Sequence, residues 1–217
     1  MRPPHQLPIG ARPRQARSRE TRERFYEATL DRFAAEGVEE ARVQDIVDDA
    51  GGSWGAYHHY FPRKEDVLLE RAAREVRDRL RPLADAAIAD RRVSIHKTLE
   101  KLFVSMMHSE LPKAVHGAVL REINANPLRF AAMLDEGQVP IVGIVGMLLA
   151  EGQERGEVRD DADPYSLGAV LAGGTVFPVM QTAFGPVMPG LEGVVQPPDP
   201  AAAVRRTFEI TWRAVAA

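Results

Sequence analysis

The stretch DDAGGSWGAYHHYFPRKED, Asp48–Asp66, gathers side chains whose types suggest binding chemistry. One Trp, two Tyr, two His and one Phe fall between positions 54 and 61. Tyr and His carry hydrogen-bonding groups on flat rings, a combination that reaches phosphates and base edges of nucleic acids. A hydrophobic core accounts for some of these rings but not for all of them.

A metal site is the first alternative for His58 and His59. Neighbouring side chains on a helix point about 100° apart, so the two rings do not easily reach one ion. The chain has no Cys, and the histidines of the second half have no acid or nucleophile at a suggestive spacing. The segment LAGGTVF, residues 171–177, lacks the Lys and the strand of a phosphate-binding loop. We therefore expect no metal, no cofactor and no enzymatic activity.

Helical periodicity predicts three helices around the aromatic stretch. They run from Ser18 to about Gly37, over residues 43–50 and over residues 54–60. Ser53 is suited to cap the third helix, and Pro62 ends it. Two short helices joined by a tight Gly-containing turn form a helix-turn-helix, in which the second helix enters the major groove of DNA.

The remainder of the chain reads as further helices. RKEDVLLERAAREVRDRLRPLADAAIA predicts a long fourth helix, bent or interrupted near Pro82. Five more segments follow, at about 92–109, 112–125, 127–155, 163–184 and 200–216. No stretch has the alternation of a strand. The predicted fold is all-α with about nine helices.

Charge is unevenly distributed along the chain. Up to residue 24 there are seven Arg and two Glu, a net charge of +5, so the remaining residues carry −8 of the overall −3. A basic end on an acidic body suggests contact with a polyanion, although a solvated basic tail is an equal alternative. The longest apolar run, residues 139–150, is too short to span a bilayer, and we expect a cytoplasmic protein.

Residues 22–69 resemble the N-terminal domain of the TetR family of bacterial transcriptional regulators. The similarity is carried by FAAEG, VQDIVDDAG, SWGAYHHYF and KEDVLL, in that order and without gaps. Five positions depart from the family pattern: Ala41, where Thr or Ser often begins the second helix, Gly52, where Val is usual, Trp54, Ala56 and His58. We expect Gly52 to loosen the turn, and the departures to change the DNA sequence that is preferred.

The resemblance and the helix geometry together predict which residues contact DNA. His58, His59 and Tyr60 project away from the predicted core, and Lys64 at the start of the fourth helix is placed to hold a phosphate. The full predicted set is Arg42, Gln44, Trp54, Gly55, Ala56, His58, His59, Tyr60 and Lys64.

The resemblance further implies a helical domain that binds a ligand and forms a homodimer. Aromatic and Met residues suggest an apolar pocket, although an ordinary core is the alternative for each of them. The predicted pocket residues are Phe103, Met106, Met107, Leu120, Phe130, Met133, Leu134, Phe177 and Met180. The predicted dimer seam comprises Leu167, Val170, Leu171, Gly174, Val204, Phe208, Thr211 and Trp212.

These expectations divide the chain into a disordered basic arm (1–17), a helix-turn-helix DNA-binding domain (18–65) and a ligand-binding and dimerisation domain (66–217). The predicted function is a ligand-responsive regulator, a repressor released from a palindromic DNA operator by a small apolar effector. An activator or a regulator without an effector is the alternative within the same fold. The alternative from another class is a helical enzyme or protein-binding module whose helix-turn-helix is structural.

Overall fold

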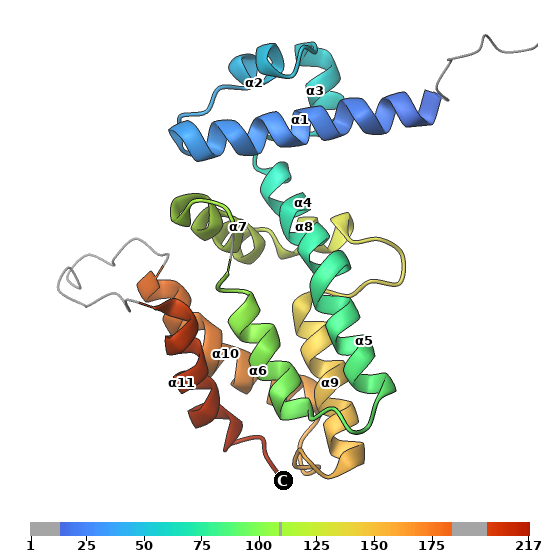
Figure 1. Ribbon diagram of the computed structural model, residues 1–217, viewed down its shortest axis with the longest axis vertical. Coiled ribbons are helices and arrows are strands. Elements are labelled where there is room, and N and C mark those ends of the chain that lie inside the picture. The colour runs from blue at the N-terminus through green and yellow to red at the C-terminus, as the bar shows by residue number, and fades with distance from the viewer. Residues whose placement is uncertain (1–13, 109, 184–198) are drawn as a thin grey trace, which may run out of the picture. The chain divides into compact units, whose positions relative to one another are not determined.

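The computed structural model describes residues 14–108, 110–183 and 199–217 (Figure 1). These residues form eleven α-helices and one π-helical turn, and their one described extended pairing is the isolated bridge between Val158 and Ala216. The predicted all-α fold is confirmed. The chain divides into two compact units, residues 1–67 and 68–217.

The first unit is built from α1 (Arg14–Glu36), α2 (Val43–Asp49) and α3 (Trp54–Tyr60), followed by the start of α4 (Asp66–Glu75). Both α2 and α3 pack on α1 and on each other, on one side of α1 (Figure 1). Their shared core consists of Phe25, Tyr26, Ile46, Val47, Ala50, Tyr57, Phe61 and Val67. The three-helix arrangement predicted from the sequence is confirmed.

Helix α1 begins four residues before its predicted start at Ser18. Residues 14–17 are Arg-Gln-Ala-Arg, which all favour a helix, and the Thr21 hydroxyl donates to the Arg17 carbonyl at 2.9 Å. The prediction of a disordered arm is therefore wrong for residues 14–17. Its residues 1–13 lie outside those that the structure describes.

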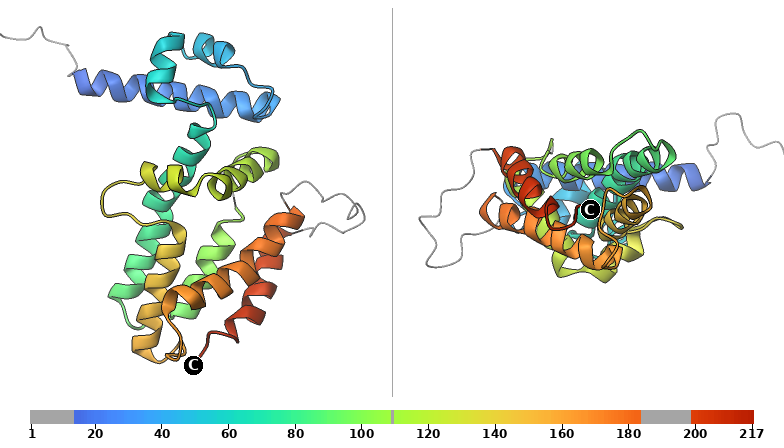
Figure 2. Two further views of the ribbon diagram at one scale, coloured as in Figure 1. Left: turned by 180° about the vertical axis from the view of Figure 1, so that it is seen from behind. Right: turned by 90° about the horizontal axis from the view of Figure 1, so that it is seen from below.

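The second unit contains the remaining helices (Figure 2). After α4 come the π-helical turn η1 (Val76–Leu80), α5 (Arg81–Ala89), α6 (Ile95–Ser105), α7 (Lys113–Ala125), α8 (Pro127–Met133), α9 (Ile141–Arg155), α10 (Pro164–Ala183) and α11 (Pro200–Trp212). Helices α6, α9, α10 and α11 pack against one another around a buried core. None of the described helices is long and apolar enough to cross a membrane.

The predicted irregularity near Pro82 takes the form of the π-helical turn. The Arg81 N–H donates to the carbonyl of Val76, five residues back, instead of four. Pro82 has no N–H, and its ring would clash with the carbonyl of Asp78 in a regular α-helix. The wider turn accommodates Pro82 without ending the helix, so α4, η1 and α5 run on continuously.

The single helix predicted over residues 127–155 is two helices in the structure. Helix α8 ends at Met133 and α9 begins at Ile141. Between them Gly137 has φ 81°, and Pro140 stands directly before α9. A left-handed Gly and a Pro both oppose a continuous helix, and together they outweigh the surrounding apolar periodicity.

Candidate DNA-binding surface and effector cavity

The orientation of α3 is fixed by its buried residue Tyr57. The Tyr57 hydroxyl lies 3.1 Å from Thr29 Oγ1, and its ring meets Phe25 edge to face with centroids 5.4 Å apart. The Thr29 hydroxyl donates to the Phe25 carbonyl at 2.6 Å, so it accepts from Tyr57. Burial raises the pKa of Tyr57 to about 12, which keeps this donor protonated. These contacts hold the opposite side of α3 toward solvent.

The turn before α3 is set by two glycines and a capping serine. Gly51 has φ 60°, a conformation that side chains disfavour. A Cβ atom on Gly52 would lie 2.4 Å from the Phe25 ring carbon Cζ. The Phe25 ring thus occupies the space that a side chain at Gly52 would need. Ser53 Oγ accepts from the Ala56 N–H at 3.2 Å, as its predicted cap role requires.

The solvent face of α3 presents Trp54, Gly55, His58 and His59. Trp54 is 58% exposed, and Gly55 and His59 are exposed beside it. The half-buried His58 ring packs on Trp54 with centroids 4.0 Å apart, and its Nδ1 lies 3.2 Å from the Pro62 carbonyl. Because a carbonyl only accepts, this contact places a proton on Nδ1.

The predicted contacts on α2 are also exposed. Arg42 occupies the N-cap of α2 and makes no capping hydrogen bond with its side chain. Gln44, two residues further along, is exposed, and its Nε2 donates to Asp48 Oδ1 at 2.9 Å. Ala56, on α3, is half-buried against the core. Among the described residues there is no group of His, Cys, Asp or Glu placed to hold a metal ion.

Tyr60 and Lys64 make intramolecular contacts that the sequence did not suggest. The Tyr60 hydroxyl lies 2.9 Å from the Ser18 hydroxyl and so ties α3 to the beginning of α1. Lys64 Nζ donates to the carbonyls of Glu39 and Ala41, both at 2.9 Å. Lys64 thus braces the loop between α1 and α2 in this structure, and a phosphate contact would have to share its remaining N–H.

The second unit holds an apolar cavity of about 300 Å³ between α6, α7, α9 and α10. Four of the predicted pocket residues line it: Phe103, Met106, Leu120 and Phe177. The sequence analysis missed its other lining residues, which are Ile123, Asn124, Ile141, Val142, Val145, Ala172, Gly173 and Val176. Most of these are aliphatic, so their type alone does not distinguish a cavity wall from an ordinary core.

A second cavity of about 50 Å³ adjoins the first and shares Met106, Leu120, Ile123 and Ile141 with it. Its remaining wall is Arg71, Ala72, Glu75, Arg79, Leu80, Leu111, His116 and Val119. The predicted pocket residues Met107, Phe130, Met133 and Leu134 line neither cavity. The side chain of Met180 lies outside the described part of the chain.

His116 should make the second unit less stable in mild acid. Burial lowers its pKa below the usual 6.5, as do the cations Arg71 and Arg79, while the bond from its Nε2 to the Met106 carbonyl opposes this. Below pH 6.5 the unfolded chain therefore takes up a proton that the folded chain refuses, so the stability falls as the pH falls. His116→Gln should reduce the drop in melting temperature between pH 7.5 and 5.5; an unchanged drop would contradict this assignment.

The predicted dimer residues lie on two different sides of α10 and α11. Leu167, Leu171, Val204 and Phe208 are buried within the second unit, so they are core residues and not a surface seam. Gly174 on α10 packs closely against Thr211 on α11 of the same chain. The contact leaves no room for a side chain at Gly174, because a Cβ atom there would lie 2.4 Å from Thr211 Cγ2. The Thr211 hydroxyl lies 2.6 Å from that of Thr175.

Other apolar residues form the outward side of these two helices. Val170 and Phe177 on α10 are 54% and 60% exposed, and Ile210 on α11 is 67% exposed. Trp212 is half-buried, with its ring stacked on Phe208 and edge-on to His96. Val170 is therefore the one residue of the predicted dimer seam that is shown here to lie on this exposed face. Phe177 and Ile210 also lie on this face, and the sequence analysis did not include them in the seam.

In this unit of three helices, a glycine turn and a capping Ser precede the exposed helix α3. This is the arrangement of helix-turn-helix DNA-binding proteins, in which α2 and α3 form the motif. Residues 25–70 match the family model described as bacterial regulatory proteins, tetR family. The resemblance to the TetR family seen in the sequence is thereby confirmed. No curated protein sequence is significantly similar to the chain.

Solved structures extend the similarity over both units. A putative TetR-family transcriptional regulator from Mesorhizobium loti is 16% identical, with a TM-score of 0.61 over 91% of this chain and 96% of that one. FadR of Thermus thermophilus, a TetR-family repressor in complex with lauroyl-CoA, is 22% identical, with a TM-score of 0.63 over 88% and 92%. SmeT, the repressor of the Stenotrophomonas maltophilia efflux pump SmeDEF, is 18% identical, with a TM-score of 0.61 over 92% of each chain. At these identities the similarity establishes a TetR-like fold.

Proposed function

We propose that the chain is a homodimeric transcriptional regulator of the cytoplasm, a repressor that leaves its DNA operator when a small molecule occupies the second unit. The observation that carries the proposal is the division of α3 into two sides. Tyr57 is fully buried, while Trp54, Gly55 and His59 face solvent. A rigidly held helix with exposed hydrogen-bonding rings is suited to a major groove.

The cavity of the second unit supports the effector part of the proposal. About 300 Å³ is at the lower end of ligand pockets, which typically measure about 300–1,000 Å³. Helix α4 starts in the first unit, at Asp66, and carries Arg71 and Glu75 in the wall of the adjoining cavity. A ligand that favours one of two placements of α4 needs only about 1–3 kcal/mol of coupling to release DNA.

The test is fluorescence anisotropy with duplex DNA from upstream of the protein's own gene, against a scrambled duplex, over a salt series. We expect tight, sequence-dependent binding that weakens steeply as the salt concentration rises, because phosphate contacts release counterions. If both duplexes bind equally and weakly, the measurement is repeated with duplexes selected from a random pool. Equally weak binding there would favour the alternative, in which the helix-turn-helix has only a structural role.

The dimer is proposed to form through the exposed face of α10 and α11, around Val170, Phe177 and Ile210. Val170→Glu should dissociate the dimer in sedimentation velocity and weaken operator binding, because a palindrome requires two recognition helices. Leu128→Glu, which places the same charge on an 85% exposed Leu of α8, is the matched control. A Val170→Glu protein that remains as dimeric as the control would reject this face.

A charge at Phe208 is a poor test of the same interface. Phe208 is fully buried in its own unit and packs on Phe103 with ring centroids 5.9 Å apart. A charge there would remain unpaired in the core, so it would unfold the unit before it reported on association.

A further inference from the structure

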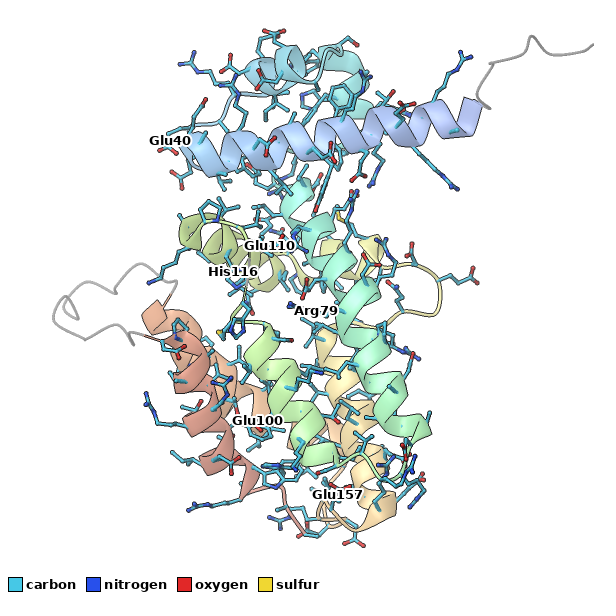
Figure 3. The ribbon with its side chains drawn as sticks, viewed as in Figure 1. Glu40, Arg79, Glu100, Glu110, His116 and Glu157 are labelled. Carbon is cyan, nitrogen blue, oxygen red and sulfur yellow. The ribbon has the colours of Figure 1, made fainter. Side chains whose placement is uncertain are left out.

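The smaller cavity has a charged wall that an apolar effector would not use. Arg71 and Glu75 come from α4, Arg79 from η1 and His116 from α7, and all four line the same space. Figure 3 labels Arg79 and His116. The rest of its wall is aliphatic apart from Met106. Charged groups beside apolar walls lose hydration, so they need partners within the site.

One carboxylate serves the two guanidinium groups in this wall. Arg71 Nη1 donates to Glu75 Oε2 at 3.3 Å, and Arg79 pairs with Glu75 Oε1. Arg79 Nη2 also donates to the Ser105 carbonyl at 2.8 Å, a neutral acceptor. The cluster of Arg71, Glu75 and Arg79 therefore carries a net charge of +1.

Glu70, Asp78 and His116, which lie near the cluster, do not cancel this charge. Burial and the nearby Arg71 lower the pKa of Arg79. His116 adds no negative charge, and its Nε2 lies 2.9 Å from the Met106 carbonyl. Two other carboxylates of this helix have cations of their own, since Glu70 pairs with Arg74 at 2.7 Å and Asp78 with Arg77 at 2.7 Å.

The charged cavity lies beside the apolar one and has part of its wall in common with it. The two share Met106, Leu120, Ile123 and Ile141, and the larger cavity has one amide, Asn124, among its otherwise apolar side chains. A ligand that filled both would meet two Arg side chains at one end and aliphatic walls along the other. The smaller cavity, at about 50 Å³, has room for a compact head group only.

We propose that the effector is an amphiphilic anion, whose carboxylate or phosphate head pairs with Arg79 and Arg71 while its short apolar tail fills the larger cavity. This inference rests on the proposed function and narrows its apolar effector to a class. Each Arg presents several N–H donors in a planar fork that matches the oxygens of either head group. The head would form ion pairs with α4 and η1, the helix that continues from the helix-turn-helix unit.

The test compares four probes with the same tail by isothermal titration calorimetry on the full chain without DNA. The probes are undecanoate, decyl phosphate, decan-1-ol and decyltrimethylammonium, which all have a ten-carbon tail, each below its micelle concentration. We expect at least one anion to bind roughly tenfold or more tighter than the alcohol, and the cation to bind weakest, because a charge-assisted bond is added to the same apolar burial. Preference between the two anions identifies the head group. Equal binding of anion and alcohol, or tightest binding of the cation, would overturn the proposal.

Variants locate the head group. Arg79→Gln should weaken the preferred anion roughly tenfold and leave the alcohol unchanged, whereas Arg79→Lys should retain most of the anion preference. Arg77→Gln is the matched control, because Arg77 lies on the same turn but pairs with Asp78 and contacts Asp135. Anion binding that remains as tight in Arg79→Gln as in Arg77→Gln would place the head group elsewhere and overturn the proposal. Operator binding is measured in a separate experiment. A protein that binds the operator but prefers the alcohol to both anions would refute the anionic effector and leave the proposed DNA-binding function standing.

Discussion

Gly55→Glu is expected to abolish sequence-specific DNA binding while both units remain folded. Gly55 is exposed on α3, and a Cβ atom there would meet no atom of the protein within 4 Å. The new side chain therefore costs the fold nothing by collision. Replacing a helical Gly should even stabilise the first unit by about 0.5–1 kcal/mol.

The cost appears only when α3 approaches DNA. A carboxylate on the groove side of α3 would stand against phosphates and acceptor-rich base edges, and like charges brought together cost several kcal/mol. We expect the affinity for the operator to fall roughly a hundredfold or more. Anisotropy measures this loss, and thermal unfolding checks that the fold survives.

Two further variants separate charge from shape. Ala35→Glu adds the same carboxylate at an exposed position near the end of α1, and should leave operator affinity close to that of the parent. Gly55→Ala adds only a methyl group, so a marked loss of affinity would mean that the helix backbone itself approaches DNA closely. If Gly55→Glu binds the operator as tightly as Ala35→Glu does, α3 is not the recognition helix.

The first unit was largely predictable from its sequence because its signals are local. Ser53 caps α3, the Gly51–Gly52 pair forms the turn, and Pro62 ends the helix. Each of these acts within a few residues, so a periodic pattern between them fixes a helix almost completely. The bonds of Lys64 to Glu39 and Ala41 were not predictable, because they join residues more than twenty positions apart.

The second unit shows where local reasoning stops. Helix α10 is apolar around most of its circumference, so periodicity does not tell which side meets its own core and which is exposed. Leu171 and Val170 are adjacent in sequence, yet one is buried and the other is half exposed. Only the packing of α9 and α11 against α10 decides this.

The cavities were harder to predict than the helices for a related reason. The sequence analysis searched for aromatic and Met residues, whereas Ile123, Ile141 and Val145 supply much of the wall. The spacing of Arg71, Glu75 and Arg79 at i, i+4 and i+8 was visible as an ordinary salt-bridged helix face. These three residues line a cavity only because α7 lies opposite them, and no short-range sequence pattern predicts that contact.

Gly52→Val is the second substitution with a large expected effect, and here the fold itself is the target. The new Cβ would lie 2.4 Å from Phe25 Cζ and 2.6 Å from Cε1, distances that no relaxed structure tolerates. The Phe25 ring also packs on Tyr57 and so cannot withdraw freely. Overpacking of this kind typically costs about 1–3 kcal/mol. Gly55→Val places the same side chain in open space on the adjacent helix, and should cost less.

The remedy for Gly52→Val follows from the same contact. Phe25→Leu removes the ring atoms that occupy the site, so it should destabilise the parent but restore part of the stability of Gly52→Val. Contacting residues typically couple by about 0.5–3 kcal/mol in a double-mutant cycle. Urea denaturation of the four proteins in a Trp212→Phe background makes Trp54 the sole Trp reporter, within the first unit. If the two substitutions add without coupling, Phe25 does not fill the space at Gly52, and the departure from the family's usual Val needs another cause.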